Sequence, residues 1–369
     1  MTARLFQPLD LGPCALPNRI AVAPMCQYSA DDGSATDWHL QHWMNLAMSG
    51  AGLVVLEATA VERRGRITHG DLGLYSQANA LAMARCLAAA RAVALPGTKF
   101  GIQIAHAGRK ASAQRPWEGG RSLQPSEDAW PTIGPSAIPF AEGWATPAEM
   151  TEEDVRHTID LFVKASVRAA ELGFDEVEMH MAHGYLMHSF QSPLSNKRTD
   201  ARGGTAAKRL STLVDLAQAV RKAVPKRVAV GARITGSDWV DGGLTVDNGI
   251  ALAGALKETG FDFVCVSSGA NSLAQKIPTG PGYQVHLAEA VKKATGIVTR
   301  AVGLIATPAQ AEEVLERGAA DQVAIGRAFL DNPRWGWHAA DALGFDLPRP
   351  PQMARVKPNL WPGAGYIRG

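Results

Sequence analysis

Eight short apolar runs recur along this chain of 369 residues, and longer stretches with helical spacing of their apolar residues separate them. Alternation of strands and helices favours parallel strands joined by crossover helices. Eight such units favour a closed (β/α)8 barrel over the alternative, an open doubly wound α/β sheet, and no GxGxxG follows an early strand. The predicted strands are 19–26, 52–59, 99–106, 174–180, 228–235, 261–268, 297–303 and 321–327.

Two segments extend beyond the eight units. The stretch 112–150, which follows the third predicted strand, is long and contains proline, glycine and tryptophan. Loops of this length in a compact domain are usually lids or binding loops. The tail 346–369 is rich in proline. We therefore predict a single barrel domain over 1–369, with a lid-like loop and a C-terminal tail.

Composition excludes several classes of protein. The formal net charge is only +2, which argues against a nucleic-acid-binding protein. No apolar run approaches the ~18 residues of a membrane span, and the first residues lack the apolar core of a signal peptide. The four cysteines lie far apart without disulfide spacing, so we expect reduced thiols in a cytoplasmic protein.

In a (β/α)8 barrel the chemistry lies at the mouth where the strands end. Many predicted strands end in polar or reactive side chains, which would meet there. They are Met25, Cys26 and Tyr28 after the first strand, Glu57, Ala58 and Thr59 at the second, Gln103 and His106 at the third, His180, His183 and Tyr185 after the fourth, Arg233 in the fifth, and Gly303, Gly326 and Arg327 at the last two.

The last two strands indicate a phosphate site. Barrels often bind phosphate through backbone N–H groups of the loops after strands seven and eight. Gly303 and Gly326 would let the backbone approach an anion closely, and Arg327 would add a charged fork of donors. Ordinary turn glycines beside a surface arginine are the alternative.

Two imidazoles and a phenol lie within six positions of the chain. From spacing alone, His180 and His183 could be metal ligands, hydrogen-bonded core residues or catalysts that need no metal. A metal would require a third ligand, such as Glu57 or Glu178. Tyr185 shifts the balance towards catalysis, because a phenol that titrates near pH ~10 stays protonated at neutral pH and can donate its proton. Such an acid beside two imidazole donors suits a reaction that builds negative charge on a substrate oxygen.

Two further residues have ambiguous roles. Cys26 is the cysteine at the predicted mouth, although a thiol there could simply be a small buried hydrophobe. Arg233 lies in a strand with apolar neighbours and would need an anionic or carbonyl partner if it points inward. A carboxylate of the barrel would serve as well as a ligand.

The motifs taken together resemble the Old Yellow Enzyme family of flavin-dependent ene-reductases, most closely its thermophilic-like subclass, over essentially the whole chain. They occur in the family's order and are NRIAVAPMCQYSA, EATAVERRGRIT, GIQIAHAGRKAS, HMAHGYLMHSFQSPLSNKRTD, RAVGLI and VAIGRAFLDNPRW. The chain departs from the family at 201–204, Ala-Arg-Gly-Gly, in a surface loop, and the tail 346–365 matches least.

The resemblance implies a bound FMN across the barrel mouth, with NADPH or NADH as reductant and no metal. The residues implied to contact the flavin are Pro24, Met25, Ala58, Gln103 and Arg233, with Cys26 tuning its potential and Gly303, Gly326 and Arg327 holding its phosphate. The implied substrate contacts are Tyr28, His180 and His183, and Tyr185 is the implied proton donor.

The resemblance also implies the reaction and the assembly. The activity would be reduction of the activated C=C bond of α,β-unsaturated carbonyl or nitro compounds, by hydride from flavin N5 and a proton from Tyr185. The assembly would be a homodimer or a tetramer of dimers, in which Arg368 reaches the neighbouring active site. A metal-dependent hydrolase or lyase on the same barrel, and a flavin-binding protein without catalysis, are the alternatives.

Overall fold

The computed structural model describes residues 3–367, and its centre is a closed barrel of parallel strands. In the order in which they pair, the strands are β3 (Ile20–Val22), β4 (Leu53–Ala60), β5 (Lys99–Ala105), β8 (Glu176–Met181), β9 (Ala229–Thr235), β10 (Phe263–Ser267), β11 (Val298–Val302) and β12 (Gln322–Ile325). Parallel pairing of β12 with β3 closes the ring. The predicted (β/α)8 barrel is therefore confirmed, and the open-sheet alternative is wrong.

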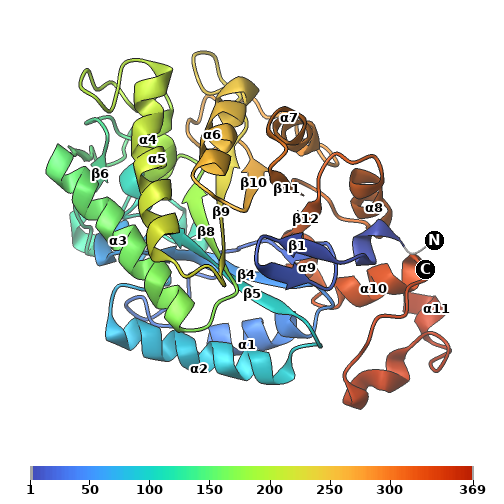
Figure 1. Ribbon diagram of the computed structural model, residues 1–369. Helices are drawn as coiled ribbons and strands as arrows, with labels where there is room; N and C mark the ends of the chain where they lie inside the picture. Colours follow the sequence, from blue (N-terminus) through green and yellow to red (C-terminus); the bar gives the residue numbers. More distant parts are fainter. Residues whose placement is uncertain (1–2, 368–369) are drawn as a thin grey trace.

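Helices cover the outside of the barrel, as Figure 1 shows. Those that connect consecutive barrel strands are α1 (Asp37–Ala47), α2 (Gln77–Val93), α3 (Glu152–Glu171), α5 (Ala206–Ala223), α6 (Val246–Glu258), α7 (Val285–Thr295) and α8 (Pro308–Glu316). The shorter α4 (Leu186–Gln191) follows β8, while α9 (Arg327–Asp331) and α10 (Trp335–Ala342) follow β12.

Helix α3 illustrates why these segments form helices. The side chain of Thr151 accepts a hydrogen bond from the backbone N–H of Asp154, and three acidic residues occupy the first turn, where the helix dipole favours negative charge. Its apolar residues, among them Val155, Ile159 and Phe162, recur at helical spacing and are buried. The helix can therefore pack only with this face against the barrel.

A hairpin fills the amino-terminal end of the barrel. Strands β1 (Leu9–Leu11) and β2 (Cys14–Leu16) pair antiparallel, after the short 3-10 helix η1 (Arg4–Phe6). Their buried side chains pack against Leu53 and Phe263, which begin two barrel strands. The polar carboxyl ends of the strands lie at the opposite end.

A layer of ion pairs lies inside the barrel. The guanidinium of Arg300 on β11 lies 2.7 Å from Glu176 and 3.0 Å from Glu178, and it also donates to Gln322 at 2.7 Å. Gln103 on β5 donates to Glu178 at 2.7 Å. Charged groups this deeply buried require such partners. The layer links four strands and fixes the side chain of Gln103.

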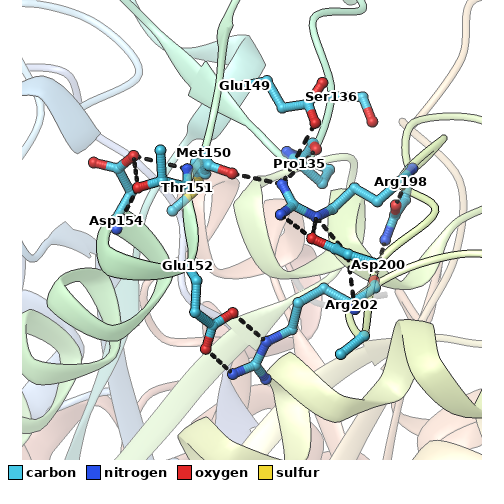
Figure 2. Close-up of polar contacts among 12 residues, drawn as sticks. Pro135, Ser136, Glu149, Met150, Thr151, Glu152, Asp154, Arg198, Asp200 and Arg202 are labelled. Carbon is cyan, nitrogen blue, oxygen red and sulfur yellow. Dashed lines mark hydrogen bonds and ion pairs between the residues drawn. The ribbon is translucent and has the colours of Figure 1, made fainter.

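The long loop 112–150 contains several short elements. They are η4 (Pro116–Glu118), η5 (Pro125–Glu127), β6 (Ile133–Gly134) and β7 (Ala148–Glu149), and the 3-10 helices η2 (Arg63–Gly65) and η3 (Gly108–Lys110) precede it. Figure 2 shows Arg198 reaching this loop from the segment after α4. Its guanidinium donates to the carbonyls of Pro135 at 3.2 Å and Met150 at 2.5 Å, and it pairs with Asp200. One arginine therefore contacts the residue that follows β6 and the residue that follows β7.

The loop at 201–204, where the sequence departs from the family, also has defined contacts. Arg202 pairs with Glu152 at 2.8 Å (Figure 2). It also pairs with Asp215, so it connects the start of α3 to the middle of α5. The tail carries η6 (Pro351–Val356) and α11 (Ala364–Ile367) and extends to one side of the barrel in Figure 1. Within residues 3–367, every helix is too short or too polar to cross a membrane.

Candidate active site

A cavity of about 310 Å³ opens at the carboxyl ends of the strands. Several residues predicted for the site line it, namely Pro24, Met25, His183, Arg233, Gly303, Gly326 and Arg327. They come from the ends of five different barrel strands or the loops that follow them. A volume in this range is typical of small-molecule and cofactor sites.

Gly303 stands where only glycine fits. Its φ of 125° is strained for other residues, and a Cβ there would lie 2.7 Å from Nε2 of Gln284. Gln284 itself donates to the carbonyl of Val302 and accepts from Ser268 at 2.5 Å, so it has little freedom to move. The backbone at Gly303 is therefore exposed to the cavity without a covering side chain.

The histidine pair lies at the end of β8. The backbone N–H of Ala182 donates to Nδ1 of His180, which places the proton of the neutral His180 ring on Nε2. That Nε2 lies 3.3 Å from Nδ1 of His183, and Nε2 of His183 lies 2.7 Å from Oγ of Ser267. Burial, and next the charge of Arg233, lowers the pKa of both histidines well below its ordinary value. Both rings are neutral at neutral pH, with one N–H each.

Tyr185 packs directly against this pair. Its ring meets the ring of His180 edge to face, with centroids 4.8 Å apart. Burial raises the pKa of the phenol well above its ordinary value, so the proton is present at neutral pH. The structure thus brings the two imidazoles and the phenol into one cluster at the mouth.

Lys110 supports the cluster from behind. Its ammonium donates to the carbonyls of His183 and Ala270, each at 2.9 Å, and lies 5.1 Å from the centre of the Tyr185 ring. Both of those carbonyls belong to residues with positive φ, 60° and 66°, so the lysine stabilises two strained turns. Burial lowers the pKa of Lys110 to about 7.

Cys26 and Tyr28 lie beyond the end of β3. Burial, reinforced by the charges of Asp71 and Glu57, raises the pKa of the Cys26 thiol well above its ordinary value. The thiol is therefore uncharged at neutral pH. Tyr28 has a positive φ of 51°, and its ring contacts Trp117 of the long loop edge to face at 5.8 Å.

Ala58 and Tyr185 line a second, smaller cavity of about 10 Å³, together with Asp71 and Gly65. Gln103 lies beneath the mouth, where its amide donates to Glu178.

Arg233, on β9 opposite His180, donates only weakly to Ser267, at 3.4 Å. Its Nε is buried and has no hydrogen-bond partner among the residues that the structure describes. Arg233 also lines the 310 Å³ cavity, and its guanidinium has donor capacity that protein groups do not use.

Sequence reasoning missed two members of the site, Lys110 and Ser267. Ser267 ends the sixth predicted strand, so the rule that selected the other residues would also have found it. Lys110 follows the third strand by five positions, in the motif HAGRK, and no local pattern indicates that it turns back to His183. The predicted Arg368 lies outside the described residues.

The acidic residues considered as metal ligands have other partners. Glu178 binds Arg300 and Gln103, and Glu57 accepts from the backbone N–H of Gln27 and lies 3.7 Å from His39. Within residues 3–367, histidine, cysteine and carboxylate side chains do not gather in any group of three that could hold a metal ion.

Comparison with known proteins identifies the family. The model of the NADH:flavin oxidoreductase / NADH oxidase family matches residues 4–344. The NADPH dehydrogenase of Listeria innocua is 40% identical over 356 residues, which cover 96% of this chain and 99% of the relative. The NADPH dehydrogenase of Bacillus velezensis is 41% identical over 358 residues, which cover 96% and 100%.

Solved structures agree in fold. Morphinone reductase superposes with a TM-score of 0.77 at 24% identity, over 96% of this chain and 93% of that one. The predicted resemblance is therefore confirmed at the level of the family. The chain belongs to the NADH:flavin oxidoreductase family, the Old Yellow Enzyme family, and is an NAD(P)H-dependent flavin oxidoreductase.

Proposed function

We propose that this protein is an FMN-dependent ene-reductase that reduces the activated C=C bond of α,β-unsaturated carbonyl compounds, and of nitroalkenes, with NADPH or NADH. The observation that carries the proposal is the cluster of His180, His183 and Tyr185 beside the 310 Å³ cavity. The two neutral N–H donors can hold a substrate oxygen that gains negative charge, and the protonated phenol can donate a proton to a substrate carbon.

The residues of the cavity fit FMN. Because Gly303 has no side chain, a phosphate in the cavity could approach its backbone closely. Arg327 lines the same cavity and carries a permanent charge. The unpartnered Nε of Arg233 suits a carbonyl or ring nitrogen of the flavin. Pro24, Met25, Ala58 and Gln103 would line the ring, with Cys26 near its reactive part. When bound, the flavin would supply the hydride chemistry between nicotinamide and alkene.

The two histidines would hold the oxygen of the substrate, with Tyr28 as a further contact. The N–H of His180 faces His183 over a long contact of 3.3 Å, which a substrate oxygen can replace with a shorter one. As the alkene accepts a hydride, negative charge moves to that oxygen. A preorganised donor aimed at such a charge contributes about 10²–10³ in rate.

Tyr185 would then donate its proton to the α-carbon of the substrate. Its raised pKa means that the proton is always present before the transfer, and that the tyrosinate left behind is costly. The ammonium of Lys110, 5.1 Å from the centre of the ring, would stabilise that tyrosinate. Lys110 would thus assist the proton donor as well as holding the turn of His183.

A spectroscopic titration tests the proposal. Purified protein should be yellow, should bleach when NADPH or NADH is added without oxygen, and should regain its colour when cyclohexenone follows. A yellow protein that nicotinamides do not bleach would be a flavin carrier, and a protein reduced by NADPH that cyclohexenone leaves bleached would reduce some other acceptor.

We also propose that the tail 346–369 lies at a subunit interface, in a homodimer or a tetramer of dimers. In support, the tail exposes Leu360 at 60% and Tyr366 at 92%, which is unfavourable for apolar and aromatic groups in water. Arg368 would then reach the neighbouring active site. Light scattering of the full chain and of a chain ending at 345 tests this, because an unchanged oligomeric state would contradict the proposal.

A further inference from the structure

The loop after β4 separates two cavities. Gly65 and Ile67 line the small cavity that contains Tyr185. Arg64 and Arg66, which alternate with them along the chain, line a different cavity of about 160 Å³. We call this second one the arginine cavity, and its lining residues are Arg63, Arg64, Arg66, His69, Asp128 and Trp130. The arginine cavity is therefore separated from the small cavity beside Tyr185 by this one segment of backbone.

Half of the residues that line the arginine cavity are arginines. Three guanidiniums face one carboxylate, Asp128. Two carboxylates outside the lining hold the arginines through Nε, since Arg63 donates to Asp32 at 2.8 Å and Arg64 donates to Glu62 at 2.9 Å. Within residues 3–367, the terminal nitrogens of Arg63 and Arg64 have no hydrogen-bond partner. A guanidinium anchored at Nε with its terminal donors free is preorganised for phosphate oxygens.

An aromatic surface accompanies these donors. The indole of Trp130 donates to the carbonyl of Arg64 at 2.9 Å, which fixes the ring beside the arginines. The guanidinium of Arg66 lies 5.4 Å from the centre of the ring, and His69 meets it edge to face at 5.0 Å. A fixed indole beside free guanidiniums is a combination that suits a nucleotide, because purine bases stack on aromatic rings and arginine binds phosphate.

We propose that the arginine cavity binds the 2′-phosphoadenosine end of NADPH and thereby selects NADPH over NADH. This inference rests on the proposed function, in which the nicotinamide end must reach the mouth beside Tyr185. The adenosine lies at the far end of the dinucleotide, and its 2′-phosphate is the sole difference between the two reductants. Arg63 and Arg64 donate to that phosphate, and Trp130 packs against the adenine.

Anaerobic stopped-flow reduction of the holoenzyme by each nicotinamide measures the effect. For Arg63→Gln/Arg64→Gln, the apparent Kd for NADPH should rise about tenfold or more, because the charged hydrogen bonds to the 2′-phosphate are lost. The Kd for NADH should change by less than about twofold, which is far less than a tenfold change, equivalent to about 1.4 kcal/mol. The limiting rate of flavin reduction should stay the same, since neither arginine touches the reacting atoms. Adenosine 2′-phosphate should compete with NADPH in the wild type and lose this effect in the variant.

Arg85→Gln is the matched control, because Arg85 is also an exposed arginine paired with an aspartate, Asp37, but lies on α2. It should leave both Kd values unchanged. Equal affinity of the wild-type enzyme for NADPH and NADH would overturn the inference, as would an equal change of both Kd values in the double variant. These results differ from failure of the proposed function, in which neither reductant bleaches the wild-type protein at all.

Discussion

Replacing Arg300 with methionine is expected to destabilise the barrel strongly. The side chain of Arg300 is 1% exposed and neutralises two carboxylates that are 0% exposed, Glu176 and Glu178. Arg300→Met leaves both without a cation, and removing one partner of a buried ion pair costs about 3–5 kcal/mol. The unfolding entropy of a chain this long is about 0.8 kcal/mol/K, so Tm should fall by about 4–6 °C.

The pH dependence has a definite sign. Burial already raises the pKa of Glu176 to about 7 although the charge of Arg300 lowers it, so Arg300→Met would raise it further above the value in the unfolded chain. The folded variant would then retain protons that the unfolded chain has released, so its stability falls as pH rises. The difference in Tm between wild type and variant should therefore shrink as pH is lowered towards about 7, where Glu176 of the wild type also retains its proton.

Thermal unfolding followed by circular dichroism measures these effects. Arg85→Met, which removes an exposed arginine paired with Asp37, should leave Tm unchanged and serves as the control. Arg300→Met/Glu176→Gln/Glu178→Gln removes the buried charges altogether and should recover at least half of the lost stability. The reasoning is refuted if Arg300→Met has the same Tm as the wild type near pH ~8, or if the difference in Tm between them grows as pH is lowered.

Three further predictions concern the active site. Tyr185→Phe should slow alkene reduction by about 10²–10⁴-fold while flavin reduction by NADPH is unaffected, and equal slowing of both half-reactions in stopped flow would remove Tyr185 from its role as acid. Cys26→Ala should shift the flavin midpoint potential by roughly 20 mV for each ~1 kcal/mol of lost interaction, and an unmoved midpoint in a redox titration would indicate a purely structural thiol. Burial lowers the pKa of Lys110 to about 7, and its ammonium holds the turn of His183, so binding of added phenol, as a ligand of the histidines, should weaken as pH rises through this value. Lys110→Met should bind phenol weakly at every pH, and a surviving pH dependence would point to another group.

Much of the architecture could be read from the sequence, because barrel strands buried on both faces are continuous apolar runs. Each of the eight predicted runs overlaps one barrel strand, although β4 and β8 extend one residue beyond their runs and the first strand is only Ile20–Val22. The rule that chemistry lies at the carboxyl ends then identified His180, His183, Tyr185 and the glycines. Each of these lies at or next to a strand end, so a local pattern determines its position.

The sequence could not determine which distant segments contact one another. The ammonium of Lys110 reaches the carbonyl of Ala270, 160 positions away, and the partner of Arg300 is Glu176, 124 positions away. The arginine cavity likewise joins the loop after β4 to Trp130 of the long loop. Strand and helix periodicity depend on neighbours in the chain, whereas burial, and with it the pKa of Lys110 and of the histidines, depends on how the closed barrel brings its loops together.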